Sequence, residues 1–293
     1  MKNVISIVVS LSLFAIGSLA FGADFKDDHG PPEGYNHKKY APCIAEEDYT
    51  IEFAAFYSVF DGVDDDNGDG ESDVLGIPEF VSYELRAEPV NYEPSPFTPS
   101  RWITDEDLNE QGIMPDHWSY HYPNGEGNDH DRGHLCTRSH AARISKEADW
   151  NTHTFYNGVP QYDQMNQGIW WNLESKISNW TNDGYDIWIV TGPVFFWDVT
   201  LEWHGEPDKG EVLAAIPHAL FKVLVRENMD SKPEVLAFIY PNEYIGKVDD
   251  EWVHEPFFTS VDYIEELTGL NFFPFLSVEQ QQLIESTQSN FLW

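Results

Sequence analysis

The sequence predicts an α+β fold, because strand-like and helix-like segments are mixed along one chain. Apolar runs typical of buried strands occupy residues 186–196, 218–227 and 234–242. Apolar residues instead recur at helical spacing across residues 163–180. Neither an internal repeat nor a clear linker divides residues 48–293, so we expect a single domain there.

The first part of the chain is expected to hold short strands separated by loops. Residues 24–47 are polar, contain Pro and Gly and show no periodicity, which predicts an irregular leader. Strand composition marks residues 48–60 and residues 77–90. Three prolines in residues 91–100 indicate a connector, and residues 101–133 are rich in loop-forming residues.

Two helices are expected in the second half. Ser260 stands at the N-cap of the later helix, and Gly269 is its stop signal. The earlier helix, residues 163–180, presents an apolar stripe to the core and carries Asn166 and Glu174 on its other side. That stripe consists of Met165, Ile169, Leu173, Ile177 and Trp180.

Residues 1–23 predict a secretory signal peptide. Lys2 precedes an apolar run, and small residues follow near Ser18 and Ala20, as at a signal-peptidase site. The run is short for a membrane span, and an uncleaved anchor is the alternative. We therefore expect a secreted or periplasmic protein that has no membrane association once processed.

The chain is extremely acidic, with 16 Lys and Arg against 51 Asp and Glu and a formal net charge of −35. Loss of Lys2 with the signal leaves 15 basic against 51 acidic residues, or −36. Such a field repels polyanions, so any nucleic-acid site has to be local. The basic groups do gather, since five of the 15 lie between Arg101 and Lys146 and six of the 11 histidines between His117 and His153.

The two cysteines, Cys43 and Cys136, allow two readings. In an oxidising compartment two thiols often form a disulfide. The alternative is two separate buried thiols, and the spacing of the residues does not decide between these states.

The loop of residues 61–76 resembles a calcium-binding loop. Its oxygen-bearing side chains follow the alternate spacing of calcium ligands, and Gly70 stands at the turn position. The twelfth position is Gly76 and not a bidentate Glu, so a structural Ca²⁺ site and a solvated acidic turn are both open. The candidate ligands are Asp65, Asn67, Asp69, Glu71 and Asp73.

The segment HYPNGEGNDHDRGHLCTRSH, residues 121–140, holds four histidines. Together with His117, three of them (His121, His130 and His134) form two pairs at the H-x₃-H spacing of zinc ligands. Glycines and a proline between and within these pairs oppose helical presentation, which disfavours zinc. Two readings of His134 are left: an inert loop residue, or a general base.

The motifs that follow favour catalysis. Residues 131–134 read DRGH, and after them come Asn157 in YNGVPQ and then MNQGIWWNLE, which contains Asn166 and Glu174. In this order, over roughly residues 77–275, the motifs resemble the DNA/RNA non-specific endonucleases of the ββα-metal superfamily. The resemblance implies a ββα-metal fold in which helices flank a central antiparallel sheet. It also implies a sugar-non-specific endonuclease of DNA and RNA that uses Mg²⁺, with Mn²⁺ as a substitute.

By position, His134 resembles the family's general base, which deprotonates water. Arg132 and Arg101 resemble arginines that contact the phosphate and its developing charge. These types suit the reaction, because imidazole titrates near neutral pH and guanidinium forks match phosphate oxygens.

The metal-binding roles carry over in the same way. Asn166 resembles the direct protein ligand of Mg²⁺, and Glu174 resembles the residue that holds the metal's water shell. Eight residues on one α-helix correspond to about 80° of rotation, which lets the two share a site. Asn157 resembles a supporting active-site residue, and Asp131 a structural buttress.

A second function class is a secreted, calcium-stabilised binding protein with a degenerate nuclease fold. The presence of His134, Arg132, Asn166 and Glu174 together favours the enzyme.

Overall fold

The computed structural model describes residues 25–44, 48–62, 74–92, 98–120, 129–227 and 232–293. The predicted signal peptide and residues 63–73 of the acidic loop, with all five candidate calcium ligands, lie outside the described residues. Among the residues described, no helix has the length and apolar character needed to span a bilayer.

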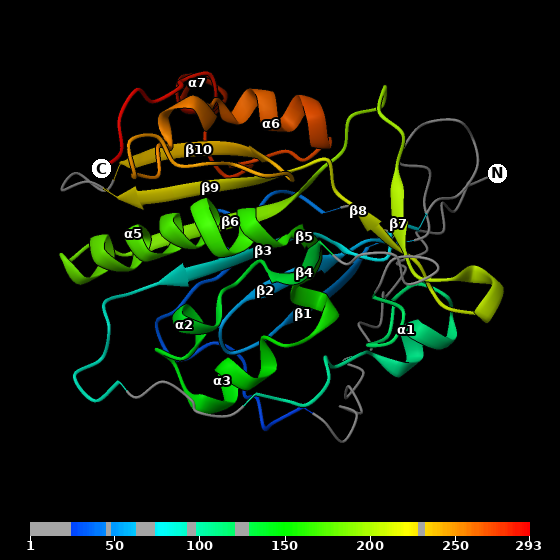
Figure 1. Ribbon diagram of the computed structural model, residues 1–293. Helices are drawn as coiled ribbons and strands as arrows, with labels where there is room; N and C mark the ends of the chain where they lie inside the picture. The colour runs from blue at the N-terminus through cyan, green and yellow to red at the C-terminus, as the bar shows by residue number, and fades with distance from the viewer. Residues whose placement is uncertain (1–24, 45–47, 63–73, 93–97, 121–128, 228–231) are drawn as a thin grey trace, which may run out of the picture.

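A seven-stranded sheet in the order β1-β2-β3-β6-β9-β10-β11 forms the centre of the molecule (Figure 1). Every neighbouring pair in it is antiparallel, so the predicted central antiparallel sheet is confirmed. Its strands are β1 (Tyr49–Glu52), β2 (Tyr57–Phe60), β3 (Pro78–Leu85), β6 (Ile187–Val194), β9 (Ala219–Glu227), β10 (Pro233–Pro241) and β11 (Phe258–Thr259).

Side-chain alternation along these strands gives the sheet two apolar faces. In β6, Ile187 and Ile189 point into one core, while Trp188 and Val190 point into the other. Helix α5 covers the first face, and α6 with α7 covers the second (Figure 1). The helices are α1 (Glu106–Glu110), α2 (Arg138–Ala141), α3 (Lys146–Asn151), α4 (Asp163–Met165), α5 (Trp171–Asn182), α6 (Val261–Thr268) and α7 (Val278–Glu285).

Two small antiparallel ribbons and four short turns complete the described fold. The ribbons are β4 (His130–His134) with β5 (Gly158–Tyr162), and β7 (Glu202–His204) with β8 (Ala214–Ile216). The turns are the 3₁₀ segments η2 (Phe155–Asn157), η4 (Pro207–Lys209) and η5 (Glu255–Phe257), and the π-helical turn η3 (Asn166–Trp170).

Several predicted elements are confirmed and others are divided. Helix α6 is capped by the Ser260 side chain and ends at Gly269 in the left-handed conformation, as expected. Residues 48–60 are a hairpin and not one strand, because the chain reverses where Phe53 N donates to Phe56 O at 2.8 Å. Both arms are equally apolar, so composition alone does not show the reversal.

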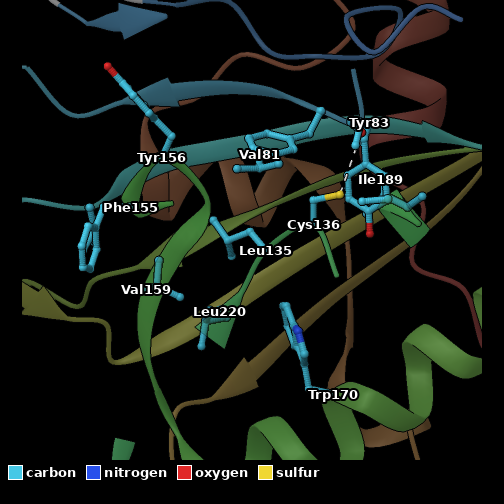
Figure 2. Close-up of a cluster of buried hydrophobic side chains, with 14 of the residues drawn as sticks. Val81, Tyr83, Leu135, Cys136, Phe155, Tyr156, Val159, Trp170, Ile189 and Leu220 are labelled. Carbon is cyan, nitrogen blue, oxygen red and sulfur yellow. Dashed lines mark hydrogen bonds between the residues drawn. The ribbon is translucent and has the colours of Figure 1, made fainter. Parts of the chain in front are cut away.

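The candidate disulfide between Cys43 and Cys136 is wrong, since both thiols are free. Figure 2 shows Cys136 among Val81, Tyr83 and Ile189, in the core between the sheet and α5. Cys43 is exposed, and its backbone N–H donates to Asn271 O at 2.9 Å, next to the core under α6. The sheet separates the two thiols.

Candidate active site

The DRGH motif forms the first strand of a ββα unit. Residues of β4 pair with β5, with His134 opposite Gly158, and the chain then enters α4, η3 and α5. Gly133 is required by close packing, because a Cβ there would lie 2.1 Å from Gln161 Oε1. This close packing favours one register between β4 and β5, and the register sets the face on which the side chains on either side of Gly133 lie.

His134 lies at the end of β4 in an aromatic setting. Its ring centroid is 4.8 Å from that of Trp102 and 4.9 Å from that of His153. Its Nε2 is buried and has no hydrogen-bond partner among the described residues. Burial holds the pKa of His134 well below 6.5, and His153 and Arg138 lower it further. The imidazole is therefore neutral at neutral pH and is able to accept a proton.

Two arginines are connected to this histidine through the chain: Arg132 lies two residues before it on β4, and Arg101 directly precedes Trp102, whose ring contacts it. Arg132 Nη2 donates to His117 O at 2.9 Å, and its Nε is buried without a hydrogen-bond partner among the described residues. The exposed Arg101 stacks 4.9 Å from the centroid of Trp118. Neither guanidinium forms an ion pair with a carboxylate within the part of the chain that the structure describes.

Asn166 is oriented by Asp131, the first residue of the DRGH motif. Asn166 Nδ2 donates to Asp131 Oδ2 at 2.9 Å, and Gln167 Nε2 donates to the same oxygen at 2.9 Å. Among the described residues no hydrogen bond engages Asn166 Oδ1, so this carbonyl oxygen is left to serve as a metal ligand. Asp131 lies three residues before His134 on β4, which corresponds to about 10 Å along the strand.

The helix around Asn166 is not continuous, which corrects the geometry expected from the sequence. Asn166–Trp170 form a π-helical turn, and Gly168 has non-helical φ and ψ of −103° and −108°. A Cβ on Gly168 would lie 2.7 Å from the Trp252 ring. The 80° relation between Asn166 and Glu174 assumed an uninterrupted α-helix and therefore does not hold. π-turns occur frequently at functional sites, where they redirect side chains.

Glu174 projects from α5 into a buried ion pair that sequence reasoning missed. Lys222 on β9 is fully buried and places Nζ 3.4 Å from Glu174 Oε1. The same Nζ lies 3.9 Å from the centroid of the Trp170 ring. Burial raises the pKa of Glu174, while Lys222 opposes this shift. A lone lysine inside the apolar run ALFKVLV was the available signal, because a buried lysine requires a partner.

Asn157 acts as a fully buried brace behind the histidine. Its Oδ1 accepts from Cys136 N at 2.7 Å. Its Nδ2 donates to Cys136 O at 2.9 Å and to Thr152 O at 3.0 Å. All three bonds go to backbone, so the side chain holds the segment just after His134 in place.

The oxygen donors present suit a hard divalent cation. Asn166 Oδ1 is a neutral carbonyl oxygen, and the Glu174 carboxylate lies at the start of the following helix. Mg²⁺ takes oxygen ligands, keeps several waters and needs few direct protein ligands. Two of the zinc candidates are engaged elsewhere, because His117 Nδ1 accepts from Trp102 N and His130 packs on Tyr162 and His204.

Comparison with known proteins agrees with this arrangement. The family described as DNA/RNA non-specific endonuclease matches residues 70–279. A nuclease of Nostoc is 28% identical over 210 residues, which cover 68% of this chain and 65% of the relative. Mitochondrial endonuclease G of Bos taurus is 28% identical over 229 residues, covering 71% and 74%. The human mitochondrial nuclease EXOG is 32% identical over 160 residues, or 50% and 40% of the two chains.

A chain from the solved EndoG–EndoGI complex superposes with a TM-score of 0.65 and 22% identity, covering 83% of this chain and 92% of that chain. This likeness shows the fold, and the ββα-metal architecture is confirmed. The family profile spans most of the residues in which the sheet and the ββα unit are formed. The chain therefore belongs to the DNA/RNA non-specific endonuclease family, whose members are nucleases that depend on a divalent metal.

Proposed function

We propose that this protein is a secreted endonuclease that hydrolyses phosphodiester bonds of both DNA and RNA, with Mg²⁺ as its metal and His134 as the general base. The observation that carries the proposal is a neutral His134 with Arg132 two residues before it on β4 and Arg101 next to its ring neighbour Trp102, where neither arginine has a carboxylate partner in the described residues. In a chain with 51 acidic residues, unpaired guanidinium groups are the local positive charge that a phosphate requires.

His134 performs the proton transfer in this proposal. Its imidazole is neutral, so a lone pair is available to take a proton from the water that attacks phosphorus. Trp102 and His153 contact the ring and limit its rotation, and Asn157 fixes the backbone that follows it. Because the base is already held in one orientation, the reaction does not incur the entropic cost of ordering its side chain.

Arg132 and Arg101 bind the phosphate of the scissile bond. Arg132 is held by its bond to His117 O, and Arg101 by stacking on Trp118. Their remaining N–H groups donate to phosphate oxygens as negative charge develops there. These contacts address phosphate alone and carry no information about base or sugar, which supports activity on both DNA and RNA.

Asn166 and Glu174 would hold the metal, Asn166 directly through Oδ1 and Glu174 through water. When bound there, Mg²⁺ supplies positive charge that stabilises the transition state of phosphodiester hydrolysis. Asp131 keeps the Asn166 amide turned so that its oxygen is available. Mn²⁺, which prefers similar oxygen ligands, is expected to substitute.

Secretion is proposed from residues 1–23 and is consistent with the acidity of the chain. In a salty external medium the Debye length is about 8 Å or less, so repulsion between the acidic surface and the substrate acts only over a short distance. Fractionation of the expressing cell, with N-terminal sequencing of the product, tests this part. Recovery of the intact Met1 terminus from the cytosol would refute secretion.

The enzymatic test uses plasmid DNA and ribosomal RNA, each with Mg²⁺ or with EDTA. We expect cleavage of both substrates with Mg²⁺ only. His134→Ala should lower kcat by about 10²–10⁴-fold, whereas His29→Ala, at an exposed position, should match the unaltered protein. Absence of Mg²⁺-dependent cleavage would refute the nuclease, and full activity of His134→Ala would refute the base.

A further inference from the structure

Helix α7 has an unusual inner face. Among its eight residues the only one buried is a glutamate, Glu285, which is 8% exposed. Two of its three apolar residues point outward, since Val278 is 67% exposed and Leu283 is 72% exposed, and the third, Ile284, is only partly buried against the core under α6. A helix is normally attached by an apolar stripe, whereas α7 contacts the body through Ile284 and a hydrogen bond from Gln281 Nε2 to Phe273 O, with Glu285 as its buried residue.

Glu285 faces two more carboxylates, on α6. Asp262 and Glu265 lie three residues apart on one face of that helix, and one oxygen from each of the three side chains lies within 4.8 Å of the others. Glu285 Oε1 is buried and has no hydrogen-bond partner among the described residues. Glu265 is fixed in place because its Oε1 accepts from Phe272 N at 2.6 Å.

Three carboxylates at this separation repel one another, and no basic group in the described part of the chain compensates them. The charged groups that act on Glu285 are Glu265 and Asp262, and the one that acts on Glu265 is Asp262. Burial first, and then these neighbours, raise the pKa of Glu285 to about 7. A buried carboxylate without a hydrogen bond is costly, and a bound cation satisfies its oxygen and removes the repulsion.

We propose that Asp262, Glu265 and Glu285 bind a divalent cation, best matched by Ca²⁺, and that this ion fastens α7 to α6. Two oxygens that bind one Ca²⁺ at about 2.3–2.6 Å lie no more than about 5 Å apart. The observed separation within 4.8 Å meets that limit without movement of either helix. The site lies on the face of the sheet opposite α5 (Figure 1), so it is structural and separate from the active site.

Hydrogen exchange of residues 278–285 tests this proposal locally, which matters because the active site and the acidic loop are further candidate cation sites. We expect CaCl₂ at about 10 mM to exceed the roughly 0.1–1 mM dissociation constants typical of extracellular calcium modules. At ten times the dissociation constant, exchange of the α7 amides should be about tenfold slower than in EDTA.

Two charge-matched variants complete the experiment. Glu285→Gln should lose the Ca²⁺ effect and, in EDTA, exchange no faster than the unaltered protein, because one like charge is removed. Glu279→Gln, on the exposed side of the same helix, should keep the full effect. If the α7 amides exchange at the same rate with and without Ca²⁺, the proposal is wrong and a shared proton, not a cation, stabilises the cluster. Retention of the effect in Glu285→Gln would place the ion elsewhere.

Discussion

The substitution Lys222→Met tests how charge is balanced beneath the active site. Lys222 Nζ lies 3.4 Å from Glu174 Oε1, and both residues are buried. Burial lowers the pKa of Lys222 and raises the pKa of Glu174, so desolvation outweighs the mutual attraction for each group. The pair itself therefore adds little stability, but removal of one member leaves an unpaired charge in the core.

We expect Lys222→Met to reduce the free energy of unfolding by about 3–5 kcal/mol. For a chain of this size, about 2–4 °C per kcal/mol corresponds to a decrease in Tm of about 6–20 °C. The double variant Glu174→Gln with Lys222→Met removes both charges and should recover most of that loss. Urea and thermal unfolding in EDTA measure these values without a contribution from bound metal.

The reasoning would be refuted if Lys222→Met lowered the free energy of unfolding by less than about 1 kcal/mol, which is the range measured for exposed ion pairs. It would also be refuted if the double variant were as unstable as the single one. A matched control is Lys209→Met, because Lys209 is exposed and its Nζ lies 2.6 Å from Glu206 Oε1. That change should leave the transition midpoint where it is.

The remaining predictions concern residues around the proposed base and the proposed metal ligand. Asp131→Ala frees the Asn166 amide, so the Mg²⁺ concentration for half-maximal cleavage should rise about tenfold or more; exposed Asp183→Ala should not change it. Asn157→Ala leaves buried backbone groups of Cys136 unpaired, so urea unfolding should show a decrease of about 2–4 kcal/mol in the free energy of unfolding. A change within experimental error would contradict this expectation. Because burial keeps the pKa of His134 below 6.5, the acid limb of kcat/KM should have an apparent pKa below 6.5, and a limb above that value contradicts this.

What the sequence determines by itself is local. Caps such as Ser260 and Gly269 act within one helical turn, and the alternation in β6 reflects the two-residue period of a strand. The ordered motifs from Asp131 to Glu174 lie within 44 consecutive residues of the ββα unit, so their order can be read directly from the sequence. These features need no knowledge of distant partners.

Tertiary structure decided the contacts that join distant segments. The antiparallel pairing of β6 with β9 brings Lys222 beneath Glu174, 48 residues earlier, and packing sets Trp102 against His134. It also places Cys43 and Cys136 on opposite sides of the sheet, and it turns Asn166 through a π-helical turn. Periodicity reports which face of an element is buried but not what covers that face. Sheet order and close packing determine the partner, because they depend on the whole chain at once.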